Sequence, residues 1–436
     1  MFNFLKRLKM LLQDPIFYYK KILEKYQNSY LCEDTEQIII GIDCDYFDAN
    51  KIKFSDFKTK FELAKQNPKT NAPFGGFFGI MGYEIVHIFE KIGNEKERFY
   101  EFPNFFFANA KNYLHYDKFS KIYTFYGENL QIYNELENLQ ISTNSQICKF
   151  HYTIKTDLNS EKSHYFEIIE KAKEKIKSGD IFQVVLGEIL ELSSNLDSLE
   201  FYEHLKINNP SPYMFHFPTP YGIVTGSSPE LIMQIKNDEI FVAPIAGTRQ
   251  RGDNLENDKA LEKELLNDEK ELAEHKMLID LARNDIGKFA QKGSVVVKNA
   301  MHIVKYESVM HIVSEVYGKK EKNASIFDIF SIIFPAGTLS GSPKIRAMQI
   351  INELESKSRG VYGGGIGFLR FNGDVLLAIL IRSAIFVPKN DEFSVFIGAG
   401  AGIVYDSVCE NEYAEICKKR KSVLKVFEEI CEKEIK

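Results

Sequence analysis

Short apolar runs of strand length and longer amphipathic stretches share the chain without regular alternation. The pattern predicts strands at 37–43, 105–113, 121–126, 180–186, 375–381 and 395–402. It predicts helices over residues 1 to about 30, over 164–178, over 268–287 and from Ser407 onward. Because strands and helices do not follow one another in βαβ order, we expect an α+β protein rather than a doubly wound sheet.

The apolar pattern thins between residues 129 and 163, where polar breaks accumulate. We therefore predict an N-terminal domain over 1–150 and a second domain over 160–430. The longest strictly apolar run, 375–381, is far shorter than a membrane span and is interpreted as a buried strand. The N-terminus has no apolar core of signal-peptide length.

Composition narrows the class of protein further. The 436 residues are 44% hydrophobic and 27% charged with a net charge of −6, which gives no electrostatic footprint for nucleic acid. The six cysteines are scattered without metal-ligand spacing, a pattern typical of reduced thiols. We expect a cytoplasmic protein with no nucleic-acid or membrane partner.

The stretch 267–287 carries the first candidate chemistry. Asp268 followed by Glu271 predicts a capped helix start, and this spacing places Glu271, Glu274, Leu278 and Ala282 on one helix face. Two carboxylates beside apolar residues are costly to bury unless a cation meets them, and Mg²⁺ prefers carboxylate oxygens. The alternative is a solvated face on which Glu271 caps the helix and its acids complement the helix dipole.

The C-terminal helix repeats this arrangement. Ser407 and Glu410 predict a capping box, and Glu412 and Glu415 follow one turn further in. Two helices with Glu-x-x-Glu pairs near their N-termini could hold a divalent cation and leave positions for an anionic ligand. Alternatively, Glu415 and Lys419 form an ordinary surface pair four residues apart.

Ten motifs, in this order, resemble the chorismate-utilising enzymes, and most closely the large, synthase subunit of anthranilate synthases. They are GDIFQVVL (179–186), NPSPYMF (209–215), TGSSPE (225–230), PIAGTR (244–249), DEKELAEHKMLIDLARNDIG (268–287), VMHIV (309–313), GTLSGSPK (337–344), VYGGGIGF (361–368), LIRSA (380–384) and GAGAGIVYDS (398–407). The resemblance is strong over 160–430 and weak over the N-terminal third. It implies two large, mainly antiparallel sheets packed face to face, with helices outside.

The resemblance also implies a site for chorismate and Mg²⁺. The implied metal ligands, which bridge through Mg²⁺ to the ring carboxylate, are Glu271, Glu274, Glu412 and Glu415. The implied substrate contacts are Tyr362 and Arg382 on the enolpyruvyl carboxylate, and Thr338, Lys419 and the backbone of Gly398, Gly400 and Gly402 on the ring carboxylate. The implied catalytic residues are Glu230, as general acid at the C4 hydroxyl, and His311. Read alone, the glycines also fit close strand packing, Arg382 a buried ion pair and His311 a core histidine.

Two positions discriminate between members of the family. Relatives that add water to chorismate carry a lysine base at the position of Gln183, and glutamine cannot take that proton. Aminodeoxychorismate synthases typically carry a nucleophilic lysine at the position of Ala246, and alanine cannot form its adduct. We therefore expect conversion of chorismate and ammonia to anthranilate and pyruvate, the first step of tryptophan biosynthesis. Aminodeoxychorismate synthase and a non-catalytic, tryptophan-sensing relative are the alternatives.

The resemblance further implies feedback regulation and a partner. The implied tryptophan site comprises Glu33, Asn209, Pro210, Ser211, Tyr213, Met214 and Phe215, with Asp34 in place of the usual serine. The proline frame at 209–212 is otherwise a rigid turn. No cysteine lies in a nucleophile-elbow context. The resemblance therefore implies a separate glutamine amidotransferase subunit that supplies ammonia within a heterodimer or heterotetramer.

Overall fold

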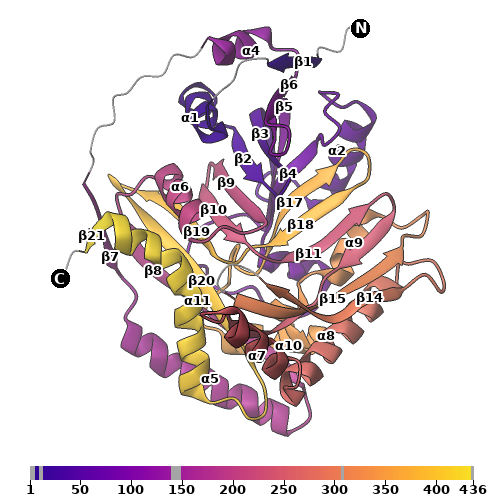
Figure 1. Cartoon of the computed structure of the whole chain (residues 1–436), viewed down its shortest axis with the longest axis vertical. Coiled ribbons are helices and arrows are strands. Elements are labelled where there is room, and N and C mark those ends of the chain that lie inside the picture. The colour runs from indigo at the N-terminus through magenta and orange to yellow at the C-terminus, as the bar shows by residue number, and fades with distance from the viewer. Residues whose placement is uncertain (1–4, 9–12, 139–148, 306–308, 434–436) are drawn as a thin grey trace.

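The computed structural model describes residues 5–8, 13–138, 149–305 and 309–433. Its strands form one hydrogen-bonded set in which β5 (Phe105–Asp117) is the branch point. One edge of β5 pairs along its length with β3 (Gln37–Asp48). The other edge pairs first with β4 (Gly76–Met81) and then with β6 (Ile122–Tyr126). Two arms therefore start at β5, one from β3 and one from β4 (Figure 1).

The first arm contains the strands predicted at 180–186 and 395–402. From β3 it continues in the order β2 (Tyr30–Glu33), β9 (Tyr213–Thr219), β10 (Gly222–Ser228), β19 (Ser383–Lys389), β20 (Glu392–Ile403), β8 (Gln183–Ser194), β7 (Phe150–Ile154) and β21 (Cys431–Lys433). The short β16 (Gly341–Ser342) lies beside β8. Neighbouring strands are antiparallel, except that β7 and β21 are parallel.

The second arm runs from β4 to a long hairpin. Its order is β17 (Gly365–Arg370), β18 (Val375–Ile379), β11 (Leu231–Lys236), β12 (Glu239–Val242) and β15 (Val309–Lys319). One edge of β15 pairs with both β12 and β13 (Ile245–Gln250), and the other edge pairs with β14 (Val296–Lys305). All of these pairs are antiparallel.

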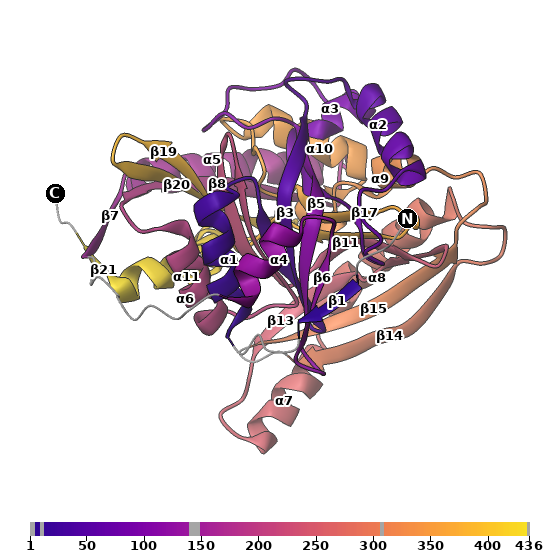
Figure 2. The same cartoon turned by 90° about the horizontal axis from the view of Figure 1, so that it is seen from above.

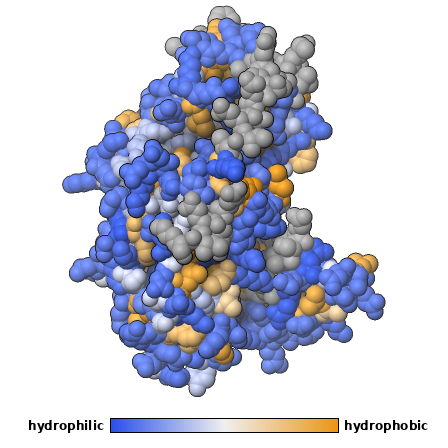
Figure 3. All heavy atoms as spheres, turned by 90° about the vertical axis from the view of Figure 1, so that its left-hand side faces the viewer, coloured by the Kyte–Doolittle hydropathy of each residue, from blue (hydrophilic) through white to orange (hydrophobic). Residues whose placement is uncertain are grey.

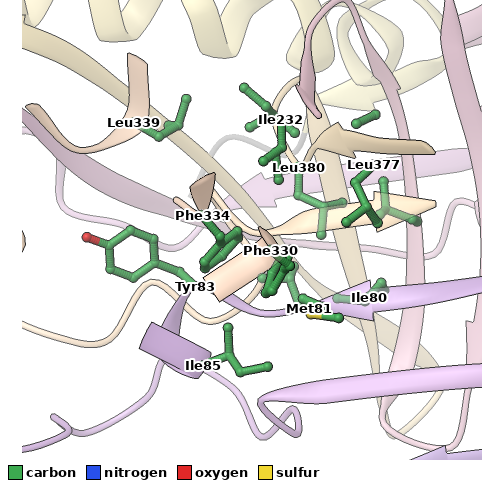
Figure 4. Close-up of a cluster of buried hydrophobic side chains, with 14 of the residues drawn as sticks. Ile80, Met81, Tyr83, Ile85, Ile232, Phe330, Phe334, Leu339, Leu377 and Leu380 are labelled. Atoms are coloured by element: carbon green, nitrogen blue, oxygen red, sulfur yellow. The ribbon is translucent and has the colours of Figure 1, made fainter. Parts of the chain in front are cut away.

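An aromatic layer packs the two arms face to face. Tyr30 in β2 stacks on Phe78 in β4 with ring centroids 4.3 Å apart, and Phe78 meets Phe217 of β9 at 5.2 Å. The layer continues into the cluster of Figure 4, where Met81, Phe330 and Leu377 come from different elements. Aromatic pairs of this kind add to the stabilisation from apolar burial. The predicted α+β class with two packed sheets is confirmed, and β5 joins the two sheets.

Helices cover the outside of both arms (Figures 1 and 2). They are α1 (Pro15–Lys25), α2 (Phe54–Gln66), α3 (Val86–Phe89), α4 (Leu130–Glu137), α5 (Leu158–Lys177), α6 (Ser198–Asn208), α7 (Leu255–Leu265), α8 (Glu269–Gly287), α9 (Ile326–Ile333), α10 (Lys344–Leu354) and α11 (Cys409–Ile430). Two 3₁₀ turns, η1 (Tyr83–Ile85) and η2 (Gly337–Leu339), join them. α7 projects from the body beside the β14–β15 hairpin (Figure 2).

The predicted start of the helix at 268–287 is confirmed. The Asp268 side chain accepts hydrogen bonds from the backbone N–H groups of Lys270 and Glu271, so Asp268 is the N-cap of α8. The predicted faces also agree with burial, because Leu278 and Ala282 are buried and Glu274 is half-buried. The helix predicted at 164–178 begins earlier, at Leu158.

Two terminal predictions are wrong. Within the predicted N-terminal helix, Leu5–Leu8 is a strand (β1) paired with β6, and the helix starts only at Pro15, where Asp14 supplies the N-cap. Residues 1–4 and 9–12 lie outside the described part of the chain. At the C-terminus, Ser407 does not cap α11. Its hydroxyl accepts a hydrogen bond from the Val404 N–H, and the helix begins at Cys409.

The N-terminal third is hydrogen-bonded to the rest of the chain. β2 pairs with β9, and β4 pairs with β17. The predicted boundary between 1–150 and 160–430 falls on β7 and the start of α5, and residues 139–148, just before it, lie outside the described part of the chain. The two-domain division stays a prediction. No helix in the described ranges is long and apolar enough to cross a membrane. The face shown in Figure 3 is largely hydrophilic, with apolar patches between the polar residues.

Candidate functional site

Glu230 is a half-buried carboxyl group at the turn between β10 and β11. The hydroxyl of Thr338, in η2, donates a hydrogen bond of 2.7 Å to Glu230 Oε1. Burial raises the pKa of Glu230 to about 7, although the Thr338 hydrogen bond and the charges of Lys419 and Arg382 oppose this rise. A large share of the molecules therefore carry a protonated Glu230 near neutral pH, and this carboxyl can donate a proton.

Arg382 lies next to this carboxyl, between β18 and β19. Its backbone has a positive φ of 52°, and its carbonyl accepts a hydrogen bond from the N–H of Ser227. Within the described residues the guanidinium donates no hydrogen bond and forms no ion pair, although its charge lowers the pKa of Glu230 and of His311. A half-buried guanidinium without a protein partner is suited to a carboxylate ligand, which it can bind through two hydrogen bonds.

Two of the predicted glycines make room for the ring of Tyr362. A Cβ on Gly398 would lie 2.3 Å from Tyr362 Cγ, and one on Gly400 would lie 2.8 Å from the Tyr362 hydroxyl oxygen. Close packing is therefore a sufficient reason for glycine at both positions. The Tyr362 hydroxyl donates no hydrogen bond within the described ranges, so it is available to a ligand.

Gln183, at the start of β8, occupies a similarly restricted position. A Cβ on Gly402 would lie 2.6 Å from Gln183 Nε2, so this glycine accommodates the amide. The other end of the amide, Oε1, is buried and has no hydrogen-bond partner among the described residues. A buried acceptor without a partner is uncommon and is satisfied here only if a donor, such as a ligand or water, approaches it.

A β-bulge places His311 next to the carboxylate helix. The register between β13 and β15 shifts between Ala246 and Thr248, and Gly247 adopts a φ of 63°. The Gly247 carbonyl lies 3.0 Å from His311 Nδ1, and a Cβ on Gly247 would lie 3.1 Å from Glu271 Oε2. Burial lowers the pKa of His311, so the imidazole is neutral at pH 7. Ala246 itself pairs with Ile312 and carries no amine.

The carboxylates of α8 and α11 influence one another. Burial, and then the neighbouring charges of Glu271 and Glu412, raise the pKa of Glu274 to about 7. Burial, and then Glu415, raise the pKa of Glu412. The two Glu-x-x-Glu pairs are thus close enough to repel, as carboxylates that share a cation do in its absence.

Basic side chains bind two of these carboxylates. Arg249 donates a 3.3 Å hydrogen bond to Glu271, and Lys419 pairs with Glu415 at 2.6 Å. In this arrangement no three Asp, Glu, His or Cys side chains of the described residues converge closely enough to hold a metal ion. The donor type and the mutual repulsion fit Mg²⁺, whereas the present side-chain positions do not form a ligand shell.

A groove of about 780 Å³ leads to these residues. Its lining includes Gln183 and Glu274, together with apolar side chains such as Phe182, Met277 and Ile345. A groove of this volume accommodates a small carboxylate substrate. Smaller cavities, of about 40 and 30 Å³, lie beside Glu230 and beside Glu33.

The structure brings together only part of the predicted tryptophan site. β2 lies beside β9, so Glu33 faces Met214 in the register, and the 30 Å³ cavity is lined by Glu33, Tyr213, Met214 and Phe215. Asn209, Pro210 and Ser211 are not in its lining. Glu33 is buried and ion-paired with Lys118 at 2.8 Å and Lys206 at 3.0 Å. The cavity holds about one water molecule, so an indole ring enters only if the walls move.

Sequence reasoning missed the contacts of two arginines. Arg249, within the recognised PIAGTR motif, binds Glu264 and Asp268 as well as Glu271. Arg359 pairs with Glu355 deep in the protein. The only sequence signal for the second pair is its spacing of four residues immediately before a glycine run.

Comparisons with known proteins agree with this geometry. Residues 14–425 match the model of a protein family described as chorismate binding enzyme. The chain is 41% identical to anthranilate synthase component 1 from Acetivibrio thermocellus, over 81% of this chain and 75% of that protein. It is 35% identical to the protein of the same name from Methanothermobacter marburgensis, over 96% of this chain and 94% of that protein.

Solved structures give the same result. The crystal structure of anthranilate synthase component I from Streptococcus pneumoniae superposes with a TM-score of 0.74 at 32% identity, covering 94% of this chain and 97% of that one. The menaquinone-specific isochorismate synthase from Escherichia coli superposes with a TM-score of 0.75 at 17% identity, covering 98% of this chain and 95% of that one. The second likeness is one of fold alone.

Proposed function

The chain belongs to the chorismate binding enzymes, and we propose that within this family it is the synthase component of an anthranilate synthase. The observation that carries the proposal is the pair of side chains at the two discriminating positions. Gln183 presents a buried amide oxygen without a described partner, and Ala246 presents only a methyl group on β13. Neither residue can activate water or attack the substrate ring, so ammonia is the nucleophile left for this site.

Chorismate is held by its two carboxylates. Arg382 and the Tyr362 hydroxyl, both without a described hydrogen-bond acceptor, receive the enolpyruvyl carboxylate. Lys419 donates to the Gly400 carbonyl at 2.7 Å and pairs with Glu415, which leaves its third N–H for the ring carboxylate. Glu271, Glu274, Glu412 and Glu415 would hold Mg²⁺ beside that carboxylate once Arg249 and Lys419 release Glu271 and Glu415. When bound, Mg²⁺ would offset the charge that builds on the ring carboxylate as the leaving group departs.

The chemistry then requires one acid and one oriented nucleophile. The protonated Glu230 carboxyl donates its proton to the C4 oxygen, the C4–O bond breaks, and the hydroxyl leaves as water. Ammonia, with one N–H directed at Gln183 Oε1, forms the C2–N bond. The new ammonium group returns its extra proton to the Glu230 carboxylate. The C2–H proton then leaves, the C3–O bond breaks, and the enolpyruvyl methylene carbon takes up a proton, which releases pyruvate and gives the aromatic ring, with neutral His311 close to the departing group. The sum is chorismate plus ammonia to anthranilate, pyruvate and water.

The test is turnover by the purified full chain with chorismate, Mg²⁺ and an ammonium salt. The expected product is anthranilate, identified by its fluorescence and its mass, with none formed by Glu230→Gln. Chorismate consumption that yields aminodeoxychorismate instead would transfer the assignment to that synthase. No consumption of chorismate would favour a non-catalytic relative.

A separate glutamine amidotransferase subunit is part of the same proposal. The described residues include no glutaminase-like nucleophile, and the free cysteines of the described chain are mostly buried. The isolated chain is therefore expected to work with ammonium salts and to form no anthranilate from glutamine. Product formation from glutamine by the isolated chain would contradict this part.

Feedback inhibition by tryptophan is proposed for the cavity between β2 and β9. Its small volume and the ion pairs of Glu33 require the cavity to open before it binds. The chain contains no tryptophan, so the fluorescence of added tryptophan reports binding without a protein background. Glu33→Gln should weaken both binding and inhibition, because the amino group then loses a charged acceptor. Inhibition that is unchanged in this variant would place the effector elsewhere.

A further inference from the structure

Arg359 is a buried arginine in the segment between α10 and the glycine run. Its side chain is only 3% exposed, and Glu355, 7% exposed, accepts from its Nε at 2.9 Å. Arg359 Nη1 donates to the Leu339 carbonyl at 2.7 Å and Nη2 donates to the Val185 carbonyl at 2.8 Å. Its backbone N–H donates to Glu84 Oε1 at 2.8 Å. Nearly all of its donor capacity is used inside the protein.

Two of the elements that Arg359 contacts, η2 and β8, carry a residue of the chorismate site. Leu339 follows Thr338, whose hydroxyl holds the Glu230 carboxyl. Val185 lies two residues after Gln183 on β8. The contacts of the Arg359 guanidinium therefore connect η2, which carries Thr338, the hydrogen-bond partner of Glu230, with β8, which carries Gln183.

The third contact is with Tyr362 itself. The Arg359 guanidinium carbon lies 5.8 Å from the centroid of the Tyr362 ring and 4.5 Å from that of Tyr83 (labelled in Figure 4). On the other side, Glu355 Oε1 accepts from the Gly187 N–H at 2.8 Å, and a Cβ on Gly187 would lie 3.0 Å from Tyr362 Cε1. The ion pair thus holds β8 against the tyrosine ring.

The fork of the guanidinium matters because its donors point in fixed, different directions. A lysine at this position would keep the charge but could not reach Glu355, Leu339 and Val185 with the same planar geometry. A role limited to stability would need only a neutralised buried charge. The directions of the contacts, toward three parts of one site, point to placement of that site.

We propose that Arg359, held by Glu355, is a positioning residue that fixes Tyr362 relative to Thr338 and Gln183 for binding of chorismate. This inference rests on the proposed chorismate site but not on the identity of the product.

The test is a double-mutant cycle on chorismate binding, with dissociation constants from calorimetry on the full chain in Mg²⁺. Arg359→Lys and Tyr362→Phe should each weaken binding about tenfold, as expected for loss of a hydrogen bond to a charged group. The double variant should be little weaker than either single variant, because a misplaced ring no longer delivers its hydroxyl. Tyr19→Phe is the matched control: it removes a buried hydroxyl that bonds His216, a residue outside this site. It should reduce stability, leave binding intact and combine additively with Tyr362→Phe.

Additive effects of Arg359→Lys and Tyr362→Phe would overturn the proposal, as would wild-type binding by Arg359→Lys. If Arg359→Lys does not fold, Glu355→Gln takes its place in the cycle, because it retains the shape of the partner and removes its charge. Binding coupled as expected but without anthranilate formation would refute the proposed activity alone. Absence of chorismate binding by the wild-type chain would refute both.

Discussion

Thr338→Val tests whether Glu230 is the proton donor. The Thr338 hydroxyl donates 2.7 Å to Glu230 Oε1, and this hydrogen bond lowers the pKa of a carboxyl that burial has raised to about 7. A hydrogen bond to a charged group contributes about 1.5–3 kcal/mol, whereas one to a neutral carboxyl contributes about 1 kcal/mol. Valine removes both, so the ionised form loses about 1.4 kcal/mol more than the neutral form, or about one pKa unit.

The Thr338→Val substitution should raise the pKa of Glu230. Without the hydroxyl the charged form is less stable, so the pKa of Glu230 rises from about 7 towards 8. Turnover requires the protonated acid, and the alkaline limb of the pH–rate profile should move up by about one unit. The position of this limb does not depend on the maximal rate, so any loss of substrate contacts through Thr338 does not obscure it.

The assay is the pH dependence of kcat/KM for chorismate, with saturating ammonia at each pH. Thr225→Val is the control, because the Thr225 hydroxyl is buried and has no hydrogen-bond partner among the described residues. It should leave the limb in place. Glu230 would be refuted as the proton donor if the alkaline limb of the pH–rate profile does not move in Thr338→Val. An equal shift of this limb in Thr225→Val would also refute it.

Three other variants test separate features of the structure. Glu230→Gln should be inactive yet more stable than wild type at pH 8.5, by about 3 kcal/mol in urea unfolding. The stabilisation from the raised pKa of this carboxyl is fully present below its unfolded value of 4.5 and is lost as pH rises through about 7. Burial lowers the pKa of His216 to about 4, so its contribution to stability is present above 6.5 and is lost as pH falls towards 4. His216→Gln should therefore flatten acid unfolding by about 3 kcal/mol across that window, and an unchanged slope would contradict this. Glu274→Gln should raise the Mg²⁺ concentration for half-maximal turnover at least tenfold, and in EDTA above pH 7 it should not lower stability, because it removes a carboxylate whose ionisation burial opposes. Equal Mg²⁺ dependence would remove Glu274 from the metal set.

Features that depend on neighbouring residues could be predicted from the sequence. The N-cap at Asp268 requires only residues 268–271, and the structure forms it as expected. The capping box at Ser407 looked equivalent, yet its hydroxyl is taken by Val404. A local sequence pattern indicates which hydrogen bonds a side chain can form, and the tertiary structure determines which of the competing partners it binds.

In the candidate site, likewise, some features could be predicted from the sequence and others could not. The motifs placed Glu230, Tyr362 and Arg382 in one site because the family resemblance carries tertiary information. The pairing of Glu355 with Arg359, and the ring of Tyr362 against Gly398, are contacts that arise only when strands and loops assemble. Nothing in the spacing of charges identifies which arginine will be buried.

The order of strands β2, β9, β10 and β19 has a mechanical consequence. Met214, in the wall of the small cavity, is the register partner of Ser227, and the Ser227 N–H binds the Arg382 carbonyl. Two strand spacings, about 10 Å, therefore separate the proposed tryptophan cavity from Arg382, the proposed chorismate ligand. A ligand that forces β2 and β9 apart would move that arginine through main-chain hydrogen bonds alone. The proposed inhibition would then need no movement of one domain against another, only a local shear within one continuous sheet.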